Sequence, residues 1–131
     1  GIVIGYEIGR LLKKETIFSE RIEGKFQLRR GFSIKKNSRV IIIEDVITTG
    51  KSSLECAKLI KQSKAKLLGF ACLIDRSNKK NLKIKNKKII SQIKLNVPIF
   101  KKSNLPKFLK KKPITKPGSR FLKWALDWAL I

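Results

Sequence analysis

Apolar residues recur along the chain at spacings that predict alternating helices and strands. Residues 5–14 carry Ile8, Leu11 and Leu12 on one side of a helix. Residues 39–43 form a largely apolar strand, as the central strands of parallel sheets do. The other predicted elements are a strand over 16–21, a charged loop or hairpin over 22–30, a helix over 52–63, and strands over 66–74, 88–93 and 98–100. Strands that alternate with helices predict the α/β class, with right-handed crossovers and a mostly parallel central sheet flanked by helices.

The most informative segment is VIIIEDVITTGKSS, residues 40–53, in which an apolar run ends in the adjacent acids Glu44 and Asp45. A turn rich in threonine and glycine follows, and then an amphipathic helix. Two like charges at the end of a buried strand are costly unless a partner compensates them. Free backbone amides at the start of a helix bind anions. Carboxylates suited to hydroxyls, beside amides suited to a phosphate, predict a site for a sugar phosphate.

Two simpler interpretations account for less of this segment. Gly50-Lys51-Ser52 matches the end of a nucleoside-triphosphate P-loop, whose pattern is Gly-x-x-x-x-Gly-Lys-Ser/Thr. The first glycine of that pattern falls on position 45, which is Asp, so a P-loop is excluded. An ordinary strand, turn and helix with a Ser52-x-x-Glu55 capping box explains the apolar run, but not the paired acids beside the threonines.

Residues 40–52 resemble the phosphoribosyl pyrophosphate signature of the type I phosphoribosyltransferases: apolar residues, two acids, two mixed residues and a Thr-x-Gly turn. The resemblance implies a Rossmann-like core in which Glu44 and Asp45 contact the ribose 2- and 3-hydroxyls and the turn wraps the 5-phosphate. The residues expected to bind phosphoribosyl pyrophosphate are Glu44, Asp45, Val46, Ile47, Thr48, Thr49, Gly50, Lys51 and Ser52.

Four further matches, in chain order, resemble the bacterial orotate phosphoribosyltransferases within this family. They are residues 1–7, like the stretch after the pyrophosphate-binding turn; residues 18–21 and 28–32, like the mobile catalytic loop and its exit; residues 73–77, like the strand end whose arginine binds orotate; and residues 116–120, like the usual C-terminal ending. The resemblance implies transfer of ribose 5-phosphate from phosphoribosyl pyrophosphate to orotate, which gives orotidine 5'-monophosphate and pyrophosphate in UMP biosynthesis.

The same resemblance assigns a catalytic role to the loop over residues 21–30, which is expected to close over pyrophosphate. Arg21 and Lys25, with Arg29 behind them, are its candidate catalytic cations, beside the two acids of the signature. In this family the loop often reaches into the neighbouring subunit, so a homodimer that shares the loop is expected. The simpler interpretation of these charges is a solvated hairpin.

Orotate itself is expected to bind Arg76, through the paired donors of its guanidinium, and the hydroxyl of Thr48. The simpler interpretation of Arg76 is a surface ion pair with Asp75. Mg²⁺ is the expected cofactor. It is expected to be held mainly through pyrophosphate, with no dedicated protein ligands.

The net charge of the chain suggests one competing function, nucleic-acid binding. The chain of 131 residues has 32 Lys and Arg against 9 Asp and Glu, for a net charge of +23. Nucleic-acid-binding proteins use such charge. Here the lysines concentrate over 79–94 and 101–116 together with Ile and Asn, a compositional bias, and charge runs are usually solvated. We therefore expect no nucleic-acid partner, although a positive field speeds the encounter with anionic substrates and weakens with salt.

The chain has room for one domain, and the resemblance implies that this phosphoribosyltransferase core covers residues 1–120. The apolar residues over 121–131, past the family's usual ending, predict an amphipathic helical extension. No apolar run has the length of a membrane span and no signal peptide is visible, so no membrane partner and a cytoplasmic location are expected. Cys56 and Cys72 are predicted to be reduced core residues. The family's N-terminal hood, first core strand and pyrophosphate turn are expected to precede Gly1, as in a truncated chain.

Three alternatives remain open. The first is a purine or uracil phosphoribosyltransferase. The second is a non-catalytic regulator of the same fold that binds nucleic acid. The third is an inactive fragment.

Overall fold

The computed structural model describes residues 1–78, 80–98, 100 and 102–113. The chain divides into two compact units, residues 1–97 and residues 98–131. In the second unit the described residues include the short helices η1 (Lys102–Asn104) and α3 (Lys107–Lys110). The predicted extension over 121–131 and the match at 116–120 lie outside the described residues.

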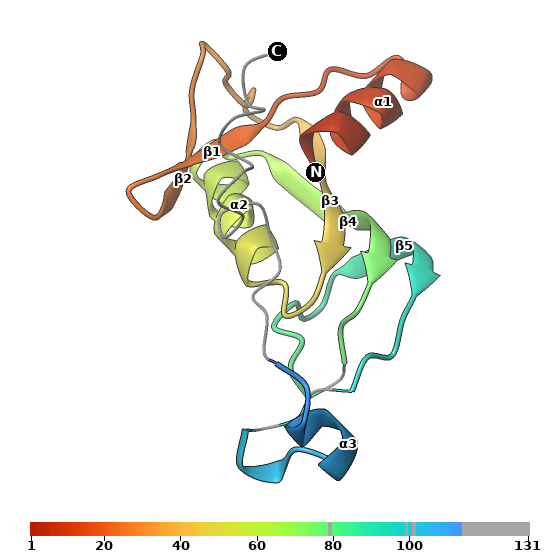
Figure 1. The fold of residues 1–131 in the computed structure, drawn as a ribbon. Helices are drawn as coiled ribbons and strands as arrows, with labels where there is room; N and C mark the ends of the chain where they lie inside the picture. The colour runs from red at the N-terminus through yellow and green to blue at the C-terminus, as the bar shows by residue number, and fades with distance from the viewer. Residues whose placement is uncertain (79, 99, 101, 114–131) are drawn as a thin grey trace, which may run out of the picture. The chain divides into compact units, whose positions relative to one another are not determined.

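A parallel three-stranded sheet is the centre of the first unit (Figure 1). Its strands lie in the order β3 (Arg39–Ile47), β4 (Lys66–Asp75) and β5 (Lys88–Lys94), and α2 (Lys51–Gln62) connects β3 to β4. The predicted α/β class, with a parallel sheet and a helical crossover, is confirmed.

Helix α1 (Ile2–Leu12) precedes a two-stranded antiparallel hairpin of β1 (Ser19–Ile22) and β2 (Lys25–Leu28). The hairpin confirms one of the two forms predicted for residues 22–30, although β1 begins at Ser19 instead of residue 16. Among the described residues, no helix combines the length and the apolar character that crossing a membrane requires.

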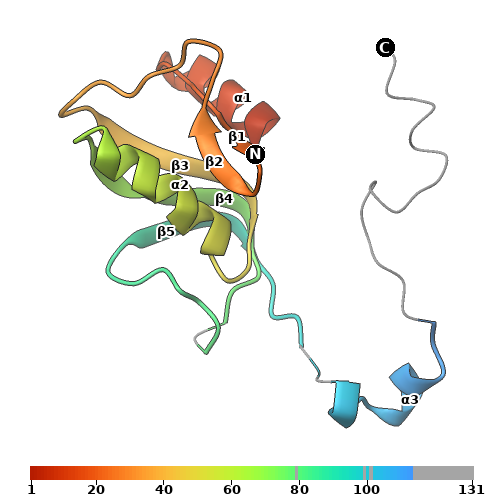
Figure 2. The same cartoon turned by 90° about the vertical axis from the view of Figure 1, so that its left-hand side faces the viewer.

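Helices α1 and α2 lie on opposite sides of β3 (Figure 2), where successive side chains alternate between the two faces. On one face Ile42 joins Ile60 of α2 in the core. On the other, a Cβ at Gly5 of α1 would lie 3.9 Å from the Cβ of Ile43, so α1 packs closely on the strand. The buried apolar core consists of Ile42, Ile47, Ile60, Phe70, Cys72 and Ile84.

Both cysteines are free and contribute to this core. Cys72 is buried, and Cys56 is half-buried against the cluster. Burial raises the pKa of both thiols, which keeps them protonated near neutral pH. Their predicted place in the core is confirmed, and their reduced state stays a prediction.

Three local expectations were wrong. Strand β3 continues to Ile47, past residue 43, and its last residues pair with Ile74 and Asp75 of β4. The two acids interrupt the apolar pattern, but the backbone pairing continues through them. Helix α2 has Gly50 as its N-cap and no side-chain cap, so the Ser52 capping box is absent. Neither Pro98 nor Phe100 lies in a strand.

Truncation of Phe70 tests whether the apolar core described above stabilises the fold. Phe70 is 1% exposed, so Phe70→Ala removes many buried contacts and leaves a cavity. We expect the free energy of unfolding, measured by urea denaturation, to fall by about 3–5 kcal/mol. The same truncation at Phe108, which is 69% exposed, should change it by less than about 0.5 kcal/mol. Equal effects of the two substitutions would contradict this description of the core.

Candidate functional site

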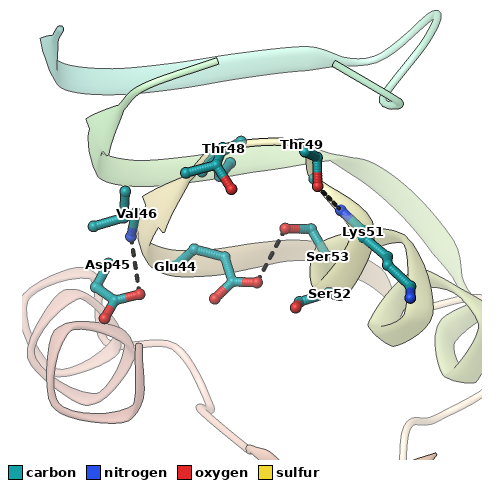
Figure 3. A pocket seen from close by; sticks show the side chains of 10 residues that line it. Glu44, Asp45, Val46, Thr48, Thr49, Lys51, Ser52 and Ser53 are labelled. Carbon is teal, nitrogen blue, oxygen red and sulfur yellow. Dashed lines mark hydrogen bonds between the residues drawn. The ribbon is translucent and has the colours of Figure 1, made fainter. Parts of the chain in front are cut away.

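A cavity of about 180 Å³ lies at the carboxyl end of β3 and is lined by residues 44–53 (Figure 3). These residues form the end of the strand, the turn and the start of α2. Every residue of the predicted phosphoribosyl pyrophosphate signature, from Glu44 to Ser52, lines this cavity. Ligands of parallel α/β sheets bind at this edge, because the carboxyl ends of the strands meet there.

The two acids point in different directions from the strand. Adjacent strand residues project to opposite faces, and Figure 3 shows Glu44 pointing toward α2 and Asp45 pointing away from it. Glu44 Oε1 accepts a hydrogen bond of 3.0 Å from Ser53 Oγ. Asp45 Oδ1 accepts one of 2.9 Å from the Val46 amide. These bonds occupy one oxygen of each carboxylate. The other oxygen of Asp45 lies 3.9 Å from the Gly1 ammonium, and the second oxygen of each acid can accept a bond from a ligand hydroxyl.

The turn directs the start of α2 into the cavity. Gly50 adopts a left-handed conformation, with φ 72° and ψ 13°, which only glycine adopts at little cost. The Lys51 amide makes a long contact of 3.4 Å with Thr49 Oγ1. The N-cap Gly50 has no side chain to cap α2, and in the described part of the chain this long contact is the side-chain hydrogen bond made by its first amides, so the Ser52 and Ser53 amides remain available to an anion.

Ser53 is a site residue that the sequence analysis missed. It is 2% exposed, and its hydroxyl holds Glu44. A signal for it exists in the sequence. Ser53 lies four residues before Ala57 and seven before Ile60, which is the spacing of a buried helical face, and both of these residues pack in the core.

The candidate catalytic cations lie on the hairpin and do not line the cavity. Arg21 donates a 2.6 Å hydrogen bond to Glu55 of α2, and its guanidinium lies 4.2 Å from the centre of the Phe26 ring. Lys25 is exposed. Arg29 lies 4.0 Å from the carboxylate of Glu20. In this conformation Arg21 is therefore held by another element of the protein.

Arg76 is exposed just after β4, and its backbone amide donates a 2.8 Å hydrogen bond to the Ile47 carbonyl. Its side chain does not line the cavity. The alternative pair with Asp75 is wrong. Asp75 is buried, accepts a bond from the Ser77 amide at 2.8 Å, and pairs with Lys94 of β5 at 3.8 Å.

A second cavity of about 640 Å³ lies between α1, the hairpin, β3 and α2. Apolar residues such as Ile8, Phe18 and Ile41 line much of it, and Glu44 lines both cavities. The smaller cavity is the better candidate site, because it gathers two carboxylates, several hydroxyls and uncapped amides. In the portion that the structure describes, no group of three or more His, Cys, Asp or Glu is arranged to hold a metal ion.

The chain matches the model of the phosphoribosyl transferase domain over residues 7–104. It belongs to this family. The orotate phosphoribosyltransferase of Parvibaculum lavamentivorans is 44% identical over 122 residues, which cover 93% of this chain and 62% of the relative. The chain thus spans less than two thirds of that relative's length. The predicted resemblance to the phosphoribosyltransferases is confirmed.

Solved structures agree on the fold. The adenine phosphoribosyltransferase of Thermoanaerobacter pseudethanolicus superposes with a TM-score of 0.57 at 19% identity, over 72% of this chain and 64% of the other. That of Leishmania tarentolae gives a TM-score of 0.52 at 25% identity, over 72% and 57% of the two chains. The type I phosphoribosyltransferase fold predicted from the signature is therefore confirmed.

The contact between Arg21 and Glu55 gives stability a predictable pH dependence. The hydrogen bond from Arg21 lowers the pKa of Glu55. The pair therefore stabilises the fold above the pKa that Glu55 has in the unfolded chain, and this stabilisation is lost as pH falls through the lowered pKa. We expect Glu55→Gln to lower the urea midpoint near neutral pH and to match the unmodified protein in acid.

Glu23→Gln is the control for this experiment, because Glu23 is exposed at the tip of the same hairpin. Its urea midpoint should follow that of the unmodified protein at every pH. A difference between Glu55→Gln and the unmodified protein that stayed constant on acidification would show that the Arg21 pair is not its source.

Proposed function

We propose that the protein is an orotate phosphoribosyltransferase, which transfers ribose 5-phosphate from phosphoribosyl pyrophosphate to orotate in UMP biosynthesis. The observation that carries this proposal is the cavity formed by residues 44–53, where paired carboxylates adjoin uncapped helix amides. The 44% identity to a relative named orotate phosphoribosyltransferase supports the choice of base.

In the proposed reaction the carbon–oxygen bond to pyrophosphate breaks at the anomeric carbon as N1 of orotate forms the new bond. Positive charge develops on the ribose ring, as in other glycosyl transfers. Glu44 and Asp45 bind the ribose hydroxyls and stabilise this charge electrostatically. N1 of orotate loses its proton as the new bond forms, and this proton passes to the departing pyrophosphate or to water. We assign neither acid as the base. The turn over residues 48–52 and the first amides of α2 bind the 5-phosphate.

Mg²⁺ is the proposed cofactor, held mainly through the pyrophosphate. The carboxylate and hydroxyl oxygens around the cavity fit a hard divalent cation that keeps most of its ligands from water and substrate phosphates. When bound, the ion would neutralise charge on the departing pyrophosphate. The residues of the chain then have to orient the sugar.

The loop over residues 21–30 is proposed to close over pyrophosphate, with Arg21 and Lys25 as catalytic cations and Arg29 behind them. Closure would exclude water and supply positive charge. Arg21 has to leave Glu55 to do so. The exposed position of that pair makes the exchange inexpensive. Arg76 and Thr48 are proposed to bind orotate.

We also propose a homodimer that shares the loop between subunits, in the cytoplasm. Exposed apolar residues on α1 support an interface, among them Val3 at 80% and Tyr6 at 63% exposure. The 640 Å³ cavity beside β3 and the unpaired edge of this strand in the described sheet support the expectation that a further core strand lies there in the full-length protein.

Two measurements, a turnover assay and a nucleic-acid-binding assay, distinguish this proposal from two other functions. Phosphoribosyl pyrophosphate is supplied with orotate, uracil, hypoxanthine or adenine, and product formation is measured for each base. Turnover with orotate alone supports the proposal, and turnover with another base reassigns the substrate. Tight, salt-sensitive binding to nucleic acid without any turnover would favour a regulator that uses the net charge of +23.

Two substitutions test the site. Asp45→Asn removes a charge that stabilises the ribose cation, and Arg76→Ala removes the proposed orotate contact. Each should cut turnover at least about a hundredfold, the scale of one lost transition-state interaction. Turnover is measured as the loss of orotate absorbance in the presence of phosphoribosyl pyrophosphate and Mg²⁺, on the full-length protein.

Matched controls make the same chemical changes at exposed positions outside the small cavity. These are Glu15→Gln, between α1 and β1, and Arg39→Ala at the first residue of β3. Both should keep nearly full turnover, and circular dichroism should report the same fold for all four variants. Unchanged rates in Asp45→Asn and Arg76→Ala would refute the assignment of the site.

A further inference from the structure

The segment that follows β4 lies directly against the turn that lines the small cavity. The Lys83 amide donates a 2.9 Å hydrogen bond to the Thr49 carbonyl. The Arg76 amide donates one of 2.8 Å to the Ile47 carbonyl. Main-chain bonds from one segment therefore hold the turn on both sides of Thr48.

Next to the bond between Lys83 and Thr49, Ile84 packs on the backbone of Gly50. A Cβ placed on Gly50 would lie 2.7 Å from both Cγ1 and Cδ1 of Ile84, and 3.6 Å from Cδ1 of Leu82. Ile84 is 6% exposed and belongs to the apolar core. The side chain of Ile84 thus fills the space in which a larger residue at position 50 would extend.

This contact restrains the backbone of Gly50, which has no side chain of its own to limit its conformation. Gly50 is the most permissive residue type, and its left-handed conformation determines where the Lys51, Ser52 and Ser53 amides point. An anion site is effective when its donors are fixed before the ligand arrives. The contact with Ile84 restrains the last residue of the turn, at the point where the chain enters α2.

We propose that Ile84 is a positioning residue for the phosphate-binding turn: it holds Gly50 in the conformation that directs the first amides of α2 at the 5-phosphate. This inference rests on the proposed function. Ile84 does not touch the substrate, and it acts through Gly50 and Thr49. Its loss should therefore weaken the binding of phosphoribosyl pyrophosphate more than it slows the chemical step.

The chain offers a matched control in Ile60, which is 3% exposed in the same core cluster but lies on α2. Ile84→Ala and Ile60→Ala remove the same atoms from the same core. Of these two residues, Ile84 provides the atoms nearest to a Cβ placed on Gly50. A purely structural role predicts that both variants behave alike in kinetics, whereas a positioning role separates them.

The experiment measures steady-state kinetics of the full-length protein with phosphoribosyl pyrophosphate, Mg²⁺ and whichever base it uses. For Ile84→Ala we expect the KM for phosphoribosyl pyrophosphate to rise between about tenfold and a hundredfold, the scale of a misplaced binding group. The kcat and the KM for the base should stay close to those of the unmodified protein. Ile60→Ala should leave all three constants unchanged.

Ile84→Val provides a second test that does not depend on a large cavity being tolerated. It removes only Cδ1, and it should raise the KM for phosphoribosyl pyrophosphate less than Ile84→Ala does, but by at least about twofold. An unchanged KM in Ile84→Val, or equal constants for Ile84→Ala and Ile60→Ala, overturns the positioning role alone. If the unmodified protein shows neither turnover nor calorimetric binding of phosphoribosyl pyrophosphate, the proposed function fails and the positioning role fails with it.

Discussion

The structure depends on the tight connection between β3 and α2. The chain leaves β3 at Ile47 and enters α2 at Lys51, so three residues have to reverse its direction. The left-handed conformation of Gly50 makes this possible, since most other residues would be strained there. A longer connection could have capped its own helix. This one leaves the first amides of α2 uncapped beside two carboxylates, and that combination gives the cavity its chemistry.

Charge distribution separates the site from the rest of the surface. Several acids form ion pairs with arginine, as Glu7 does with Arg10 and Glu55 with Arg21, and these contacts lower the pKa of both carboxyls. With 32 cationic residues in the chain, such partners are abundant. Yet in the described part of the chain neither Glu44 nor Asp45 forms an ion pair with a lysine or arginine. Asp45 meets the ammonium of Gly1 at the long distance of 3.9 Å, so both carboxylates can accept hydrogen bonds from hydroxyl groups and stabilise a cation formed during a reaction.

The sequence predicted the type of most elements, because each depends on local patterns of apolar residues and turns. It also predicted the small cavity, because the residues from Glu44 to Ser52 are consecutive. The end of β3 could not be predicted, since the apolar pattern stops at the acids while pairing with β4 continues to Ile47. The ion pair of Asp75 with Lys94 depends on the register between β4 and β5, which a single sequence does not fix. The same limit applies to Arg21, whose partner Glu55 lies on another element.

The contacts of the turn show that the proposed sugar-phosphate site and the proposed base-binding residue lie on two different segments of the chain. The small cavity, the proposed cradle for a phosphate and a sugar, is lined by one continuous segment, so its geometry is set by the β3–α2 connection. The segment after β4 is different, because its exposed side chains can vary as long as its backbone bonds to Ile47 and Thr49 and the buried side chain of Ile84 are kept. If Arg76 contacts the base as proposed, then the residue that selects the base sits on the segment that also braces the turn. A change of base specificity can then occur at exposed side chains such as Arg76, while a change at buried Ile84 would disturb the cradle itself.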